Sequence, residues 1–289
     1  MTLLAAGKVN YRARIERAAA LAERGGFAAT EILSFYGELA KFQKEYYEAL
    51  PKLWGKKPVV PANGDLRSEL RVELLLEAFP GLLKVVEQRA PGALAEEARS
   101  LQSAGTERQG EILRGFWKTG LIERSSPGTL AEPDGGPMSL VDFFARAMLQ
   151  PYAEFVTSAM LPPAPLMTVC RCPRCNALPL LGVLRTETDG GGGKRYLLCS
   201  FCSLEWEFRR ILCAKCGEEA ERKLPVFVAE QLPHIRMECC DTCKHFLRTV
   251  DLTKDGHAVP LVDDLAAVPL SLWAEENGYR RIQGNLLWT

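Results

Sequence analysis

The stretch CRCPRCNALPLLGVLR, residues 170–185, places three cysteines within six positions and then becomes apolar. It opens a cysteine-rich region, because all ten cysteines of the chain lie between Cys170 and Cys243. Eight of them form four Cys-x-x-Cys pairs, namely Cys172/Cys175, Cys199/Cys202, Cys213/Cys216 and Cys240/Cys243. The last two pairs repeat the first two at an offset of 41 residues, with all four positions in register. The spacing predicts one structural unit that is used twice.

Within each unit, 23 residues separate the two pairs, which is enough for a β-hairpin that returns the second pair beside the first. Four thiolates can then converge in a tetrahedron about one metal ion. The repeat favours a separate site in each unit, although spacing alone also allows cross-braced ligation. We therefore predict two tetrahedral four-cysteine sites for iron or zinc, between which the spacing does not discriminate.

The residues that follow the pairs support this geometry. Asn176 and Gly217 occupy equivalent places in the repeat, and asparagine and glycine tolerate the left-handed backbone that a metal-binding turn requires. Ser203 and Lys244 occupy the matching places after the trailing pairs and suit that backbone less well. We expect tighter or more strained turns there.

Thiol chemistry offers rival interpretations of the cysteines. A dithiol enzyme needs a reactive pair at the start of a helix, whereas Cys175 leads into the strand-like NALPLLGVL. Structural disulfides are rare in the reducing cytoplasm. Cys170 and Cys239 fall outside the repeat. We expect each to pack as a small apolar group beside its own site, with a replacement ligand or redox-active thiol as the alternative.

The charge composition of the chain limits the classes of binding partner that we expect. The 289 residues carry 36 basic and 36 acidic side chains, so no overall charge favours nucleic acid or an anionic membrane. A basic patch would need Arg209, Arg210, Lys215, Arg222 and Lys223, which we interpret as a solvated face, and a nucleic-acid partner is not expected. Arginines interrupt the N-terminus before a signal peptide could form, and no run of 18 apolar residues follows. These features predict a cytoplasmic protein without membrane insertion.

The first 169 residues contain no cysteine and have the apolar periodicity of helices. We expect helices near 10–23, from about residue 32 until Pro51 ends it, at 66–89 with Asp65 as cap and a break at Pro80, and from Ser139 with a kink at Pro151. Further helices are expected at 92–103 and 107–120. LPPAPL at 161–166 reads as a linker and DGGGGK at 189–194 as a hairpin tip.

The predicted class is α+β, with an N-terminal α-helical domain followed by two tandem rubredoxin-like or zinc-ribbon modules. The expected domains are residues 1–165, 166–210 and 211–289, the last including a helical tail. In that tail, Asp263 and Asp264 are expected to cap a short turn, Pro269 to open a helix and Gly278 to end it.

Longer motifs carry a family resemblance. CPRCNALPLLGVLR, RYLLCSFCSLEWEFRRILCAKCGEE and MECCDTCKHFLR resemble the formate dehydrogenase accessory protein FdhE family. The resemblance implies a non-catalytic cytoplasmic factor that binds the catalytic subunit of respiratory formate dehydrogenase, and it assigns the ligand role to the eight paired cysteines. Cys239 stands where that family usually has another residue. A nucleic-acid-binding zinc ribbon and a rubredoxin-like electron-transfer protein are the alternative functions.

For the accessory role, we expect the metal modules to rigidify a docking surface and the helical domain to complete a groove. Phe201, Trp206 and Phe208 are candidates to line that groove if they are exposed, although core packing is the expected role of Trp206.

Overall fold

The computed structural model describes residues 9–24, 30–55, 65–68, 70–120, 139–160, 167–186 and 193–287. The predicted linker at 161–166 and residues 189–192 of the predicted hairpin tip lie outside these ranges, whereas Gly193 and Lys194 of that tip begin β2. The N-terminal half is helical, as expected. Its elements are α1 Tyr11–Glu23, α2 Thr30–Trp54, the short 3-10 turn η1 Leu66–Ser68, α3 Val72–Arg89, α4 Gly92–Gly115, the π-helical turn η2 Phe116–Gly120 and α6 Leu140–Ser158.

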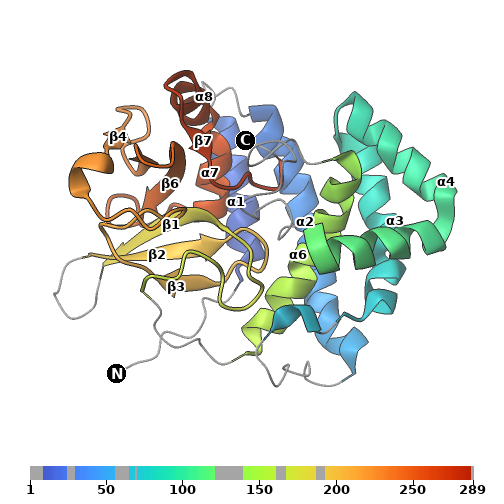
Figure 1. The fold of residues 1–289 in the computed structure, drawn as a ribbon. Coiled ribbons are helices and arrows are strands. Elements are labelled where there is room, and N and C mark those ends of the chain that lie inside the picture. The colour runs from blue at the N-terminus through green and yellow to red at the C-terminus, as the bar shows by residue number, and fades with distance from the viewer. Residues whose placement is uncertain are drawn as a thin grey trace.

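The C-terminal half is built around one sheet, and the whole chain is of the α+β class (Figure 1). Its strands are β1 Pro179–Thr186, β2 Gly193–Cys199, β3 Glu205–Glu207, β4 Val226–Val228, β5 Ile235–Cys240, β6 His245–Asp251 and β7 Arg280–Arg281. They lie in the order β3-β2-β1-β6-β5-β4, with β7 paired to β6. The turn η3 Glu221–Lys223 precedes β4, and helices α7 Pro260–Ala266 and α8 Val268–Glu276 follow β6.

The sequence repeat is visible in this topology. The antiparallel pairs β1·β2 and β2·β3 of the first unit correspond to β4·β5 and β5·β6 of the second. The two units meet through a parallel pairing of β1 with β6, in which Gly182 lies opposite Thr249. The duplication therefore forms one continuous sheet.

Gly182 is required at this junction because its neighbour comes very close. A Cβ at position 182 would lie 2.3 Å from Thr249 Oγ1 and 3.2 Å from Thr249 Cβ. We expect Gly182→Ala to lower the free energy of unfolding by about 1–3 kcal/mol, the usual cost of overpacking. Urea denaturation measures this. Adding Thr249→Ala, which removes the closest atom, should recover most of the loss, whereas a single variant as stable as wild type would contradict the tight junction.

Helix α6 links the helical part to the sheet (Figure 1). Every residue from Phe143 to Thr157 is buried, including charged Arg146 and Glu154. Its apolar side chains belong to the main core, which also contains the four cysteines of the first unit. One core therefore joins α2, α3, α4 and α6 to the first metal module.

Several predicted helix boundaries differ from those in the structure. Helix α2 continues through Pro51 to Trp54, one turn beyond the expected end, and α3 continues through Pro80 as one helix. A proline removes one backbone hydrogen-bond donor from a helix. Burial of the apolar faces of α2 and α3 compensates for the lost hydrogen bond. Asp65 caps η1 instead of α3, since its carboxylate accepts a bond from the Arg67 amide. The start of α6 at Ser139 is confirmed by a capping box with Asp142.

The tail also differs from expectation in one respect. Pro269 lies at the start of α8 and Gly278 follows the helix with a φ of 80°, as predicted. Asp263 accepts the Val259 amide at the start of α7, as a capping residue does, but both Asp263 and Asp264 are also buried within α7 as partners of arginines. Arg17 from α1 pairs with Asp263 at 2.6 Å, and Arg248 from β6 pairs with Asp264 at 2.8 Å. These two ion pairs fasten α7 to both halves of the molecule.

Among the described residues, no helix combines the length and the apolar character needed to cross a membrane.

Candidate metal centres

The first four-cysteine group consists of Cys172, Cys175, Cys199 and Cys202. Its sulfur atoms lie 3.3 Å apart for Cys175 and Cys199, 3.5 Å for Cys172 and Cys202, and 3.7 Å for Cys175 and Cys202. Sulfurs that are each about 2.3 Å from one metal ion stand about 3.8 Å apart in a tetrahedron. The group therefore needs little adjustment to enclose an ion.

The second group consists of Cys213, Cys216, Cys240 and Cys243. The sulfurs of Cys213 and Cys243 lie 3.7 Å apart, and those of Cys216 and Cys240 lie 3.8 Å apart. Each unit thus gathers its own cysteines, which confirms the pairing of neighbours over cross-bracing. Two all-sulfur tetrahedral groups suit zinc or iron and do not suit calcium or magnesium, which require oxygen ligands.

The four Cys-x-x-Cys turns share one backbone geometry. The residue after each pair has a positive φ, of 58° at Asn176, 53° at Ser203, 76° at Gly217 and 55° at Lys244. The left-handed conformation is therefore present after the trailing pairs as well, despite their less suitable side chains. This conformation lets the amide of Asn176 bond to the Cys172 carbonyl at 2.9 Å, and the amide of Lys244 to the Cys240 carbonyl at 2.8 Å.

Backbone amides also donate towards the sulfurs. The amide of Phe201 lies 3.4 Å from the Cys199 sulfur, and that of Lys215 lies 3.4 Å from the Cys213 sulfur. Such bonds stabilise a thiolate, which is the form of cysteine that binds metal. The turns are therefore arranged for ligation.

The two groups differ in exposure. All four cysteines of the first group are buried, whereas Cys216 is exposed and Cys243 is partly exposed in the second. The helical half covers the first group directly: the Leu66 amide bonds to the Arg174 carbonyl at 2.9 Å, and Arg67 Nε donates to the Cys175 carbonyl at 2.9 Å. The first module is therefore an inner site and the second an outer site.

The thiols of the outer site differ in their pKa values. A hydrogen bond from Cys243 lowers the pKa of Cys213 to about 5, whereas partial burial raises the pKa of Cys216 to about 11. A metal ion must displace the protons that remain, so its affinity for this group falls as the pH falls.

The two cysteines outside the repeat have different surroundings. Cys239 is 2% exposed and packs with Met237, Phe246 and Tyr279 on the face of the sheet beneath α8. It fits the expected role of a small apolar residue. Cys170 is partly exposed, and its sulfur lies 3.6 Å from the carbonyl of Cys213. It also packs against the core that contains the four cysteines of its own unit, so it contacts both units.

The aromatic candidates for a docking groove are core residues. Phe201, Trp206 and Phe208 are 1%, 3% and 1% exposed. The Trp206 indole donates to the Val169 carbonyl at 2.9 Å, and Phe201 contacts Trp117 of η2. Core packing, the role expected of Trp206, applies to all three.

One further group of possible ligands is already neutralised by an arginine. His234, Asp255 and Asp263 lie close enough to hold a metal ion. Arg17, however, donates to Asp255 at 2.9 Å and to Asp263 at 2.6 Å, and His234 bonds to Asp263 at 2.9 Å. The sequence did not indicate this cluster, because its members lie far apart in the chain. Its contacts are those of an ion-pair network that joins α1 to α7.

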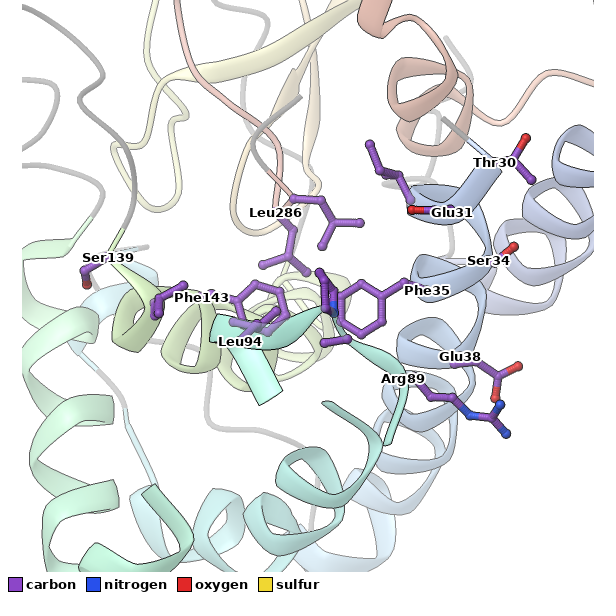
Figure 2. Close-up of a pocket in the computed structure, with 15 residues that line it drawn as sticks. Thr30, Glu31, Ser34, Phe35, Glu38, Arg89, Leu94, Ser139, Phe143 and Leu286 are labelled. Atoms are coloured by element: carbon purple, nitrogen blue, oxygen red, sulfur yellow. The ribbon is translucent and has the colours of Figure 1, made fainter. Parts of the chain in front are cut away.

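A groove of about 760 Å³ lies on the helical half, away from both cysteine groups. Figure 2 shows Phe35 of α2, Leu94 of α4, Phe143 of α6 and Leu286 of the tail directed towards one another, with Glu38 and Arg89 at the edge. The paired cysteines do not contribute to its lining, so this groove belongs to the helices and the tail alone.

Comparisons with known proteins agree with this architecture. Two family models match consecutive segments, the central domain of FdhE at residues 171–210 and the C-terminal domain of FdhE at residues 211–288. Residues 171–288 are therefore similar to the central and C-terminal domains of the FdhE family. A protein FdhE homolog from Aquifex aeolicus is 27% identical over 220 residues, which are 76% of this chain and 72% of the relative. An FdhE homolog from Pseudomonas putida is 32% identical over 53% of this chain.

The chain matches half the length of the Pseudomonas putida FdhE relative. A solved structure extends the likeness over nearly the whole molecule. The crystal structure of the FdhE protein from Pseudomonas aeruginosa is 25% identical to this chain in sequence and matches it with a TM-score of 0.69. The match covers 96% of this chain and 95% of the chain in that structure. The helical half, which the two family models do not include, therefore also has the FdhE fold.

Proposed function

We propose that this protein is a non-catalytic accessory factor for the maturation of respiratory formate dehydrogenase. It acts in the cytoplasm and binds the catalytic subunit of that enzyme through its metal-stabilised part. Similarity to the FdhE family supports this role, and the resemblance of the cysteine motifs supports the choice of client. The eight paired cysteines are the proposed ligands.

The proposed mode of action rests on the difference in exposure between the two cysteine groups. The inner site is enclosed by the helical half, so its contribution is to stability. The outer site lies at the surface, where Cys216 is exposed, and the second module around it is open to a partner. Iron or zinc bound by four thiolates stabilises such modules, and iron also permits one-electron exchange.

A nucleic-acid partner is less well supported. Two of the five side chains of the possible basic patch are already paired, Arg209 with Glu219 at 2.7 Å and Lys223 with Glu218 at 3.5 Å. These pairs reduce the charge available to phosphates, which supply most of the affinity of non-specific nucleic-acid binding.

An anaerobic affinity pull-down from the native host, with co-purifying proteins identified by mass spectrometry, tests the proposal. We expect wild type to recover a formate dehydrogenase catalytic subunit and the double variant Cys240→Ser/Cys243→Ser to lose it, because the outer site can no longer order its module. Cys170→Ser is the matched control, since it removes a nearby thiol that is not a proposed ligand, and it should retain the client. Recovery of nuclease-released proteins without formate dehydrogenase would favour nucleic-acid binding instead.

A further inference from the structure

The two outer edges of the sheet are chemically different. At one end, the β3 edge carries Glu205 and Glu207, which pair with Arg185 at 2.7 Å and Lys194 at 3.5 Å. Charged residues of this kind prevent an edge strand from pairing with another chain. At the other end, β4 consists of Val226, Phe227 and Val228, which are all exposed. Of these two ends of the described strand path, the β4 edge is therefore the one that is open to an additional strand.

The hydrogen-bond register shows which groups of β4 are available. The amides of Asp241 and Cys239 donate to the carbonyls of Lys223 and Pro225 across the β4·β5 pair. In an antiparallel pair, alternate residues bond to the neighbour, so Phe227 faces β5 while Val226 and Val228 direct their amides and carbonyls outwards. Within the described part of the chain, no bond to these outward groups is present. They form a ready template for an extended backbone.

Apolar side chains lie on both faces beside this edge, and on one face charged side chains lie among them. On one face, Phe227 packs on Trp273 of α8 with ring centres 4.7 Å apart. On the other, Val226 borders a cavity of about 340 Å³, whose lining includes the apolar Leu224 and the charged Arg236 and Glu238. Val226, Val228 and Ile211 are 52%, 52% and 47% exposed. A strand added to β4 would therefore meet apolar surface on the Trp273 face and a mixed apolar and charged surface on the other face.

We propose that the free edge of β4 binds an extended apolar peptide segment by adding it to the sheet as a further strand. Strands of this kind are buried on both sides in finished proteins, so they are accessible only before a protein has folded. The same cavity is lined by Cys213 and Cys240, which places the binding edge against the outer metal site. That the segment comes from formate dehydrogenase rests on the proposed function, whereas strand addition itself does not.

A direct binding experiment tests strand addition without any formate dehydrogenase. The probe is a fluorescein-labelled peptide of about six valine and isoleucine residues, the usual length of a strand, with a lysine at each end. Its binding to the metal-loaded full-length protein is followed by fluorescence anisotropy. A second peptide of the same sequence carries N-methyl groups on alternate amides, on the side that would face β4, and cannot donate to that edge. We expect the first peptide to bind and the second to bind at least about tenfold more weakly, as loss of several main-chain bonds requires.

Two protein variants localise the binding. Val228→Pro removes one outward amide, and Val226→Lys/Val228→Lys gives β4 the charge that protects other edges. Each should weaken binding about tenfold, with metal content and circular dichroism unchanged. Leu140→Lys alters an exposed apolar residue at the helical groove and should have no effect.

Equal binding of both peptides, or weaker binding by Leu140→Lys alone, would overturn strand addition at β4. Because the pull-down measures client recovery separately, a positive pull-down with no peptide binding would refute this inference and leave the proposed function intact. Peptide binding with no client recovery would do the reverse.

Discussion

Cys199→Ser is expected to abolish the folded state of the protein, whereas Cys216→Ser is expected to lose one metal ion and keep most of the fold. Cys199 is fully buried in the main core, while Cys216 lies at the surface. Metal binding supplies about 10–16 kcal/mol to small four-cysteine modules, which matches or exceeds the 5–15 kcal/mol stability of a typical domain. Loss of the inner site should therefore reach the helical half through the shared core.

Tryptophan fluorescence, near-ultraviolet circular dichroism and metal analysis distinguish these outcomes. Trp117 and Trp206 lie in the same core as the inner site and report its integrity. Cys216→Ser should retain the signals of Trp117 and Trp206 with half the metal of wild type, and Cys170→Ser should retain the full native spectra and the full metal content. Native spectra and cooperative urea unfolding in Cys199→Ser would contradict the structural role of the inner site.

Arg146→Met is expected to lower the free energy of unfolding by about 3–5 kcal/mol, the range for breaking a buried polar network. Arg146 is 1% exposed, and burial lowers its pKa to about 10. Its guanidinium donates to the carbonyls of Ser200 at 2.8 Å, Asn285 at 2.9 Å and Gly284 at 3.1 Å. It thereby connects α6 to the trailing turn of the inner site and to the C-terminal tail.

Methionine retains an unbranched apolar side chain but leaves these three carbonyls without their donor. Urea denaturation measures the loss, and faster release of metal to a chelator should accompany it, because Ser200 lies between Cys199 and Cys202. Arg12→Met is the matched control, since the Arg12 side chain is 81% exposed and its removal should change stability little. Equal stability of Arg146→Met and Arg12→Met would show that the buried network is not important.

The sequence predicted the structure best where the spacing of the cysteines along the chain leaves few possible geometries. The register of the four cysteine pairs predicted both groups and their separate assembly, because four ligands in a short hairpin unit leave few geometries. The left-handed turns at Asn176 and Gly217 were also predicted, since those residue types favour them. The same turns at Ser203 and Lys244 show that the ligand geometry overrides local preference.

Properties that depend on tertiary packing were not predictable. The two units have the same spacing, so nothing in the repeat indicates that Leu66 and Arg67 cover the first site and leave the second at the surface. Pro51 and Pro80 remain within helices because of the faces those helices bury. Asp263 and Asp264 resemble helix-capping residues in sequence, and their arginine partners come from distant segments.

Formate-dependent dye reduction by a host that lacks this protein tests the central claim most directly. The account predicts that the host makes the formate dehydrogenase catalytic subunit but has little of its activity. It further predicts that wild type and Cys170→Ser restore the activity, while Cys240→Ser/Cys243→Ser does not. Full formate dehydrogenase activity in the host without this protein, or full restoration by the double variant, would contradict a maturation role that depends on the outer metal site.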